Sequence, residues 1–365
     1  MKADENGRIL YLDIAKGIGI ILMVMGHASF GKVFYHYIHG FHMPLFFFVS
    51  GLLFTFKSNK SWTEVFLGKC RTILIPYAFF GLATYGFWVL TRNGRVTGAD
   101  LLTPLQHLLW NNSHGLAISG EFWFLSAMFF ASLFFDGLFR FIGKPVLRAS
   151  ALIALALIGC LFRCAFDMEL PWSMLSAMVG MGFMGIAFFL RRNAEEGGFA
   201  RRLFALRWYE IILTALISGV LIFLNGPTNM RRSLYSIVPL FWLNAAVMSL
   251  VIVNLSKKIE NQPLRGFADR FRNWLAGVGR DSITYLCINS LVLHIVGGFY
   301  GKIFGQGLTV YRSAVVFTLG MVIIYWINRI IMKTNVRVLL GRRPLKNETE
   351  RSQADASTGR HCGNK

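Results

Sequence analysis

The stretch YLDIAKGIGIILMVMGHAS, residues 11–29, is apolar over enough length to cross a bilayer as a helix. It carries three side chains, Asp13, Lys16 and His27, that are costly to bury in hydrocarbon and are therefore candidates for function. Lys16 and His27 stand 11 residues apart. That interval is close to three helical turns, so both are expected on one helix face, about 16 Å apart along the axis, with Asp13 nearly in line. The pattern predicts a polar seam along the first membrane helix.

A structural explanation of the same three residues is also open. Lys16 would extend its ammonium group toward lipid headgroups with Asp13 as its partner, and His27 would sit at the membrane interface. The segment is long, contains Asp13 and Lys16, and lacks a small-x-small cleavage site at its end. We therefore expect it to remain as the first helix and not to be removed as a signal peptide.

Composition places the chain in a membrane. Of its 365 residues 55% are apolar and only 15% are charged, which is too apolar for a soluble domain of this length. We expect an all-α, polytopic integral membrane protein with about ten transmembrane helices, because ten apolar runs approach the roughly 20 residues that cross a hydrocarbon core. The runs cover residues 9–29, 36–56, 73–91, 122–142, 149–166, 173–190, 209–225, 235–254, 281–301 and 311–332.

The net charge of +20 is explained by topology. With the N-terminus in the cytoplasm, 27 of the 38 Lys and Arg residues fall in inner segments and seven in outer ones. This asymmetry predicts that both termini are cytoplasmic, and it requires no nucleic-acid partner; the basic inner segments are expected at anionic lipid headgroups. Residues 1–340 are expected to form the transmembrane domain. Residues 341–365 hold almost no apolar side chains, which predicts a disordered cytoplasmic tail.

Three histidines, His36, His39 and His42, follow the first helix at intervals of three residues. Such spacing on a helical turn is one way to build a metal site. However, no carboxylate or cysteine nearby completes a ligand set, and Gly40 and Pro44 interrupt the regular helix that the spacing assumes. We therefore expect no metal and interpret these histidines as the lining of a polar, substrate-binding entrance at the outer surface, with irregular backbone facing a cavity.

The next inner loop, residues 57–71, carries Lys69 and Arg71 just before an apolar run. Such a basic cluster is often only a topology signal. The alternative is that Lys69 and Arg71 contact the phosphates of an anionic cytoplasmic ligand.

The outer loop of residues 92–121 ends in a lone carboxylate, Glu121, followed by Trp123. Aromatic and polar groups suit a carbohydrate, so we take Glu121 and Trp123 as substrate-binding candidates, although Trp123 is also typical of an interfacial aromatic belt. Farther on, Arg163 and Asp167 are four residues apart in the fifth span, which predicts a structural ion pair.

Several motifs, taken in order, resemble the signatures of the membrane-bound acyltransferase-3 family. They are DIAKGIGIILMVMGH (13–27), FHMPLFFFVSGLLF (41–54), the basic residues before ILIPY (73–77), GEFWFLSAMFF (120–130) and GRDSITYLCINSLVLH (279–294). The resemblance runs from Leu12 to about His294, and the first two blocks are its most specific part. Members that resemble this chain O-acetylate sugars of bacterial surface polysaccharides, O-antigen among them, and typically have ten core helices.

The resemblance implies roles for particular residues. The family's basic residue and histidine, separated by ten positions, fall on Lys16 and His27; the family more often has arginine first, and lysine keeps the charge but not the forked donor set. The family's arginine pair maps only loosely onto Lys69 and Arg71. A histidine is frequent where this chain has Asn289, so no catalytic role is assigned there.

The implied reaction is transfer of an acetyl group from acetyl-CoA, a co-substrate made in the cytoplasm, to a hydroxyl of a glycan in the bacterial inner membrane. His27 would be the general base, since a histidine is well matched to remove the proton of an attacking hydroxyl. Lys16 would meet the donor and Asp13 would compensate its charge, while Lys69 and Arg71 would contact the diphosphate.

Other functions remain open on sequence alone. A transporter or flippase of lipid-linked sugars would also have many spans and buried charges, although we see no internal repeat of the kind such proteins show. A structural or polymer-export partner would not need His27. Within the acyltransferase interpretation, the sugar, the hydroxyl, the length of the acyl group, and the choice between direct transfer and an acyl-histidine intermediate are left open.

Overall fold

The computed structural model describes residues 8–92, 98–110, 112–116, 118–305 and 309–344. In these ranges the regular structure is helical apart from an isolated bridge and one antiparallel hairpin of two-residue strands, β1 (Thr228–Asn229) and β2 (Leu234–Tyr235). Nine helical segments of the described chain are long and apolar enough to span a membrane. The prediction of an all-α, polytopic membrane protein is thereby confirmed.

The nine segments follow the expected runs closely. They are α1 (Leu10–His27), a unit of α4 (Trp62–Lys69), η1 (Cys70–Leu74) and α5 (Ile75–Thr91), α7 (Phe122–Phe141), α8 (Pro145–Phe166), α9 (Met174–Glu195) with the preceding turn η2 (Pro171–Ser173), α11 (Trp208–Asn225), α12 (Val238–Asn261), α14 (Ser282–Phe304) and α15 (Thr309–Lys333).

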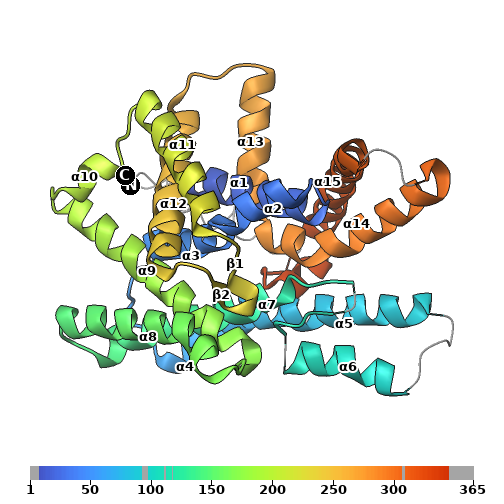
Figure 1. Ribbon diagram of the computed structural model, residues 1–365, viewed down its shortest axis with the longest axis horizontal. Coiled ribbons are helices and arrows are strands. Elements are labelled where there is room, and N and C mark those ends of the chain that lie inside the picture. Colours follow the sequence, from blue (N-terminus) through green and yellow to red (C-terminus); the bar gives the residue numbers. More distant parts are fainter. Residues whose placement is uncertain (1–7, 93–97, 111, 117, 306–308, 345–365) are drawn as a thin grey trace, which may run out of the picture.

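The second expected span is broken in two. Residues 36–56 contain the end of α2 (Lys32–His39) and all of α3 (His42–Leu53), each too short to cross a bilayer alone. Gly40 follows α2 directly, and a Cβ placed on it would lie 3.0 Å from the Ile222 side chain of α11. The interruption expected from Gly40 and Pro44 is therefore present at the chain position where α2 packs beside α11 (Figure 1).

The loop expected over residues 57–71 is largely helical, which corrects the sequence interpretation. Ser61 and Glu64 form a capping box: the Ser61 hydroxyl accepts a hydrogen bond from the Glu64 amide at 3.2 Å, and the Glu64 carboxylate accepts one from the Ser61 amide at 2.7 Å. Helix α4 starts there and continues through the π-helical turn η1 into α5. Lys69 is thus the last residue of α4, and Arg71 lies in the π-helical turn of the same continuous helical unit.

Helix α1 lies near the middle of the molecule, with α12 and α13 (Phe267–Arg280) on one side and α14 and α15 on the other (Figure 1). The backbones of α1 and α13 approach each other closely. A Cβ on Gly17 would lie 2.1 Å from the Leu275 carbonyl oxygen, and one on Gly279 would lie 1.8 Å from the Asp13 carbonyl oxygen. Only glycine permits such an approach. The segment between the expected spans 235–254 and 281–301 therefore includes a helix that packs tightly against the Leu10 end of α1.

The remaining short elements are α6 (Gly98–Leu109), α10 (Ala200–Leu203), η3 (Met230–Arg232) and η4 (Asn335–Leu340). Residues 345–365 of the predicted tail lie outside the described residues. Its first residues are described: Arg342 donates hydrogen bonds to the Asp281 carboxylate at 3.0 Å and to the Arg280 carbonyl at 2.9 Å. Gly341, with φ +68°, packs against the Arg71 carbonyl, where a side chain would collide.

Candidate active site

A cavity of about 480 Å³ opens at the His27 end of α1. Its walls come from α1, α2, α3, the loop before α7, η3, α14 and α15, so segments far apart in the chain meet around it. Five of the residues singled out from sequence, His27, His39, His42, Glu121 and Trp123, line it together. Its volume falls within the roughly 300–1,000 Å³ of small-molecule sites.

The His27 ring is held by α14. Its Nδ1 is hydrogen-bonded to the side-chain oxygen Oδ1 of Asn289, and the Asn289 amide nitrogen donates to the Leu286 carbonyl oxygen at 2.7 Å. Because the Leu286 carbonyl can only accept, the Asn289 oxygen is the atom that faces His27, and Nδ1 must carry the proton. The Nε2 lone pair is therefore left for the cavity, which is the tautomer that a general base needs.

A second contact joins His27 to Glu121 through Ser290. The Ser290 hydroxyl donates to Glu121 Oε2 at 2.7 Å, and its oxygen lies 3.2 Å from His27 Nδ1. Glu121 is 3% exposed and precedes the first turn of α7, where the helix dipole favours a negative charge. Its other oxygen, Oε1, is buried without a hydrogen-bond partner among the described residues. The Glu121 carboxylate thus has one oxygen paired with Ser290 and one buried oxygen with an unused acceptor.

The three histidines of residues 36–42 separate into two groups. His39 and His42 donate from Nδ1 to the carbonyls of Tyr35 at 2.8 Å and Ile38 at 2.6 Å, and their rings meet edge to face. His36 instead bonds the Ile222 carbonyl at 3.3 Å and packs against Phe223, away from the cavity lining. The described residues contain no group of three or more His, Cys, Asp or Glu side chains placed to hold a metal ion.

The other end of the predicted seam is an ion pair. Lys16 Nζ lies 2.6 Å from Asp13 Oδ1, and both side chains are mostly buried. In the described structure the cavity lining on α1 begins at Met23, about 10 Å along the axis from Lys16. The structure therefore brings Asp13 and Lys16 together but does not bring them to the cavity that His27 lines.

Lys69 and Arg71 lie apart from that cavity as well. Lys69 is half-buried and Arg71 is exposed, and the π-helical turn η1 follows Lys69 directly. The Arg71 backbone is covered by Gly341, and Arg342 next to it reaches Asp281 and the Arg280 carbonyl. Since Gly279 touches Asp13, this arginine-rich group lies at the Leu10 end of α1, opposite His27.

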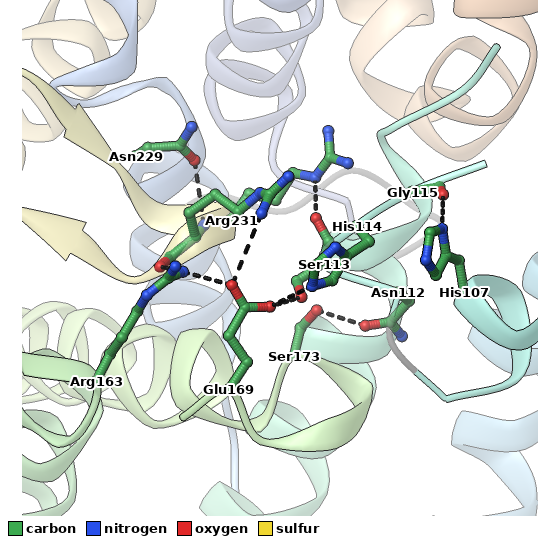
Figure 2. Close-up of polar contacts among 11 residues, drawn as sticks. His107, Asn112, Ser113, His114, Gly115, Arg163, Glu169, Ser173, Asn229 and Arg231 are labelled. Atoms are coloured by element: carbon green, nitrogen blue, oxygen red, sulfur yellow. Dashed lines mark hydrogen bonds and ion pairs between the residues drawn. The ribbon is translucent and has the colours of Figure 1, made fainter. Parts of the chain in front are cut away.

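Loops at the His27 end are tied together around Glu169, as Figure 2 shows. Its carboxylate lies 2.5 Å from Arg163, 3.2 Å from His114 and 3.9 Å from Arg232, and it accepts from the Ser113 hydroxyl at 2.5 Å. Burial alone would raise the pKa of Glu169, but the Ser113 hydrogen bond and these cations lower it below its ordinary value.

The expected Arg163–Asp167 pair is therefore wrong. Asp167 ends α8 in a left-handed conformation, with φ 46°, and the chain then turns so that Glu169 meets Arg163. Helical spacing could not reveal this partner, because α8 stops at Phe166.

Five further residues of the site, Asn289, Ser290, Arg231, Arg312 and His294, were given no role from sequence. Asn289 and Ser290 lie in the last quoted motif, but a motif does not show that α14 faces His27. Arg231 and Arg312 line the same cavity and stood out in the sequence only as basic residues of outer segments. His294, one turn after Ser290, lines it too.

One of three comparisons with known proteins agrees with the motifs. A comparison with curated proteins and one with solved structures each found no match to the chain. The model of the acyltransferase-3 family, described as an acyltransferase domain, matches residues 9–329. This match covers most of the chain and includes α1, the cavity walls and α14. The chain therefore belongs to the acyltransferase-3 family.

Proposed function

We propose that the chain transfers an acetyl group from acetyl-CoA to a sugar hydroxyl of a surface polysaccharide or its lipid-linked precursor, in the bacterial inner membrane. The observation that carries the proposal is the His27 ring, whose Nδ1 is engaged by Asn289 while the ring lines a cavity of about 480 Å³. Family membership supplies acyl transfer as the reaction class. The acetyl group, its donor and the glycan acceptor are parts of the proposal.

The chemical step uses Nε2 of His27. It removes the proton from the sugar hydroxyl as the hydroxyl oxygen attacks the thioester carbonyl carbon. The C–S bond then breaks, the new ester is released, and the imidazolium returns its proton to the departing thiolate. The Asn289 oxygen stabilises the imidazolium by accepting from Nδ1–H, as an orienting group does for a catalytic histidine.

Glu121 and Trp123 support acceptor binding in this scheme. Glu121 lines the cavity, and its carboxylate is a hydrogen-bond acceptor suited to a second hydroxyl of the sugar. Trp123, which is 6% exposed, presents part of an aromatic surface suited to an apolar sugar face. Together they would hold one hydroxyl near His27.

The donor is proposed to enter from the opposite end of α1. Lys16 and the arginines around Arg342 lie there, and cations of this kind suit the phosphates of coenzyme A. Lys69 and Arg71 belong to the same end, and the Arg71 backbone contacts Gly341. The thioester arm would then extend along α1 toward His27.

The proposal is tested by replacing His27 with Ala in the purified protein, reconstituted in lipid and supplied with radiolabelled acetyl-CoA and glycan acceptor. We expect transfer to fall by about 100-fold or more, the usual range for loss of a general base. His36→Ala is the matched control, since His36 bonds the Ile222 carbonyl outside the cavity lining and its loss should leave most of the transfer. Undiminished transfer by His27→Ala would exclude the proposed chemistry.

A further inference from the structure

Two arginines face the His27 cavity from opposite elements. Arg231 comes from η3, in the turn of the β1–β2 hairpin, and Arg312 comes from the first turns of α15. Glu121 is the one carboxylate among the described lining residues, and it already accepts a hydrogen bond from Ser290. The charged part of this cavity is therefore mainly cationic.

Arg231 is held with its charge uncompensated. Its Nε donates to the Ser113 carbonyl (Figure 2), and within the described chain no carboxylate lies within ion-pair distance of it, whereas its neighbour Arg232 reaches Glu169. Burial is the main cause that lowers the pKa of Arg231, and the neighbouring charge of Arg232 lowers it further. The charge of Glu121 raises it. The group remains a guanidinium at neutral pH, because the ordinary pKa of arginine lies far above 7.

The chain makes room for this guanidinium. A Cβ on Gly115 would lie 2.4 Å from Arg231 Nη2, and one on Gly120 would lie 2.3 Å from Nη1. The two glycines flank the bridge between Leu116 and Ser119, so the terminal nitrogens of Arg231 pack closely against Gly115 and Gly120 at the cavity wall. Such a fixed, half-buried guanidinium group, with several N–H donors in one plane, is well suited to bind a planar or tetrahedral oxyanion.

Arg312 completes the pair from the other side. It is half-buried beside Gly297 of α14, where a Cβ would lie 3.8 Å from Arg312 Nη2, and the described residues offer it no ion pair. Two partly desolvated cations facing one cavity are costly unless an anion enters it. A neutral sugar would supply hydroxyls but no compensating charge.

We propose that the acceptor carries an oxyanion, a carboxylate or phosphate on the glycan, which binds between Arg231 and Arg312 while a nearby hydroxyl of the same acceptor meets His27. This inference rests on the proposed function and narrows its acceptor class to acidic glycans. The arginines act as specificity residues, and their charge selects acceptors before the acyl group is transferred.

The experiment compares three acceptors of one sugar in the purified, lipid-reconstituted protein with acetyl-CoA: methyl glucoside, methyl glucuronide and glucose 6-phosphate. We expect kcat/KM to be at least 10-fold higher for one of the two anionic acceptors than for the neutral one. Comparison of methyl glucuronide with glucose 6-phosphate shows whether the site binds a carboxylate or a phosphate. In Arg312→Gln the ratio of anionic to neutral kcat/KM should fall at least 10-fold. Arg312→Lys should recover part of it.

Lys302→Gln is the matched control, because Lys302 is an exposed cation at the end of α14 that does not line the cavity. It should leave the ratio unchanged. Arg231→Gln should lower the ratio as Arg312→Gln does. A neutral acceptor used as well as both anionic ones, or an identical ratio in Arg312→Gln and Lys302→Gln, would overturn the inference while leaving acyl transfer intact.

A measurement without acetyl-CoA separates the two proposals. Methyl glucuronide or glucose 6-phosphate should raise the thermal unfolding temperature of the protein more than methyl glucoside does, and Arg312→Gln should remove the difference. If no acceptor is acylated yet this arginine-dependent stabilisation is seen, the oxyanion site stands and the proposed reaction fails. Equal stabilisation by all three compounds would count against the oxyanion site.

Discussion

The role of individual residues in the site depends on partners that lie far away in the chain. The spacing of Lys16 and His27 was sufficient to place both on one helix, and α1 is indeed continuous from Leu10 to His27. Sequence could not place Asn289 against His27, because the two are 262 residues apart and the contact depends on how α14 packs beside α1. The sequence shows which side chains carry charged or reactive groups, but it does not show which of them contact one another in the fold.

Replacing Asn289 with Ala should lower kcat for acetyl transfer by about 10- to 100-fold, by analogy with the loss of residues that orient metal-bound histidines. The change removes the acceptor of the His27 Nδ1 proton and frees the ring to rotate. Asn289→Asp should retain more activity, because a carboxylate oxygen can accept the same hydrogen bond. Steady-state kinetics check this: a raised KM for the acceptor with unchanged kcat would contradict an orienting role.

Lys16→Arg should retain more transfer activity than Lys16→Ala, because the proposed role of Lys16 depends on its charge. The 2.6 Å pair with Asp13 means that Lys16→Ala also leaves a mostly buried carboxylate unpaired. The double variant Lys16→Ala, Asp13→Asn removes both charges and controls for this effect on stability. We expect this double variant to regain the thermal stability of the wild type but not its KM for acetyl-CoA. Recovery of both would assign Lys16 a structural role alone.

At the scale of helices, hydropathy located the membrane-crossing segments well. It located poorly the positions where a segment is interrupted. Apolar runs of the right length survive in any packing, so nine of the expected spans appear within the described residues. The second span breaks between α2 and α3 because Gly40 and Pro44 lower the cost of an interruption. The Ser61–Glu64 capping box marks the start of α4 in the sequence, but the basic residues of segment 57–71 favoured a loop. Helix α13 is amphipathic and too short to register as a span.

Gly279→Ala should destabilise the protein, because the added methyl would overlap the Asp13 carbonyl where α13 crosses α1. Overpacking of this kind costs about 1–3 kcal/mol. Gly298→Ala is the matched control, a glycine in α14 whose added Cβ would meet nothing within 4 Å. Thermal unfolding in detergent should show a lower midpoint for Gly279→Ala only. Equal midpoints would mean that α13 can move away from α1 without cost.

At the scale of the whole molecule, the cavity exists because distant loops are joined around Glu169. Ser113 and Glu169 are 56 residues apart, and Arg163 reaches a carbonyl 69 residues away at Arg232. No local pattern encodes such contacts, and the sequence instead suggested Asp167 as the partner of Arg163. The loop that carries Ser113 also carries the Gly115 and Gly120 positions around Arg231. Fixing these loops therefore shapes the cavity wall.

The contribution of Glu169 to stability should depend on pH. Its folded-state pKa lies below its ordinary value of 4.5, so its stabilising effect is full above about pH 4.5 and is lost as pH falls through the folded-state pKa. Glu169→Gln should lower the unfolding midpoint at pH 7 by about 2–4 °C, as expected for a partly exposed pair worth about 1 kcal/mol.

The difference between wild type and Glu169→Gln should shrink as pH is lowered below 4.5, which thermal scans at several pH values can follow. Glu196→Gln is the control, since Glu196 makes a comparable pair with Arg192 but is 64% exposed. A pH-independent difference for Glu169→Gln would show that its contribution comes from packing and not from charge.

The unbroken helix between Lys16 and His27 fixes the distance over which the proposed reaction must work. Eleven residues of helix set a fixed span of about 16 Å, so α1 acts as a ruler between the end that would hold the donor phosphates and the end that would receive the thioester. A thioester on a long flexible arm can bridge that span, whereas an acetyl ester of a short thiol cannot use both ends at once. Adding one residue inside the span would rotate His27 by about 100° and carry it away from Asn289.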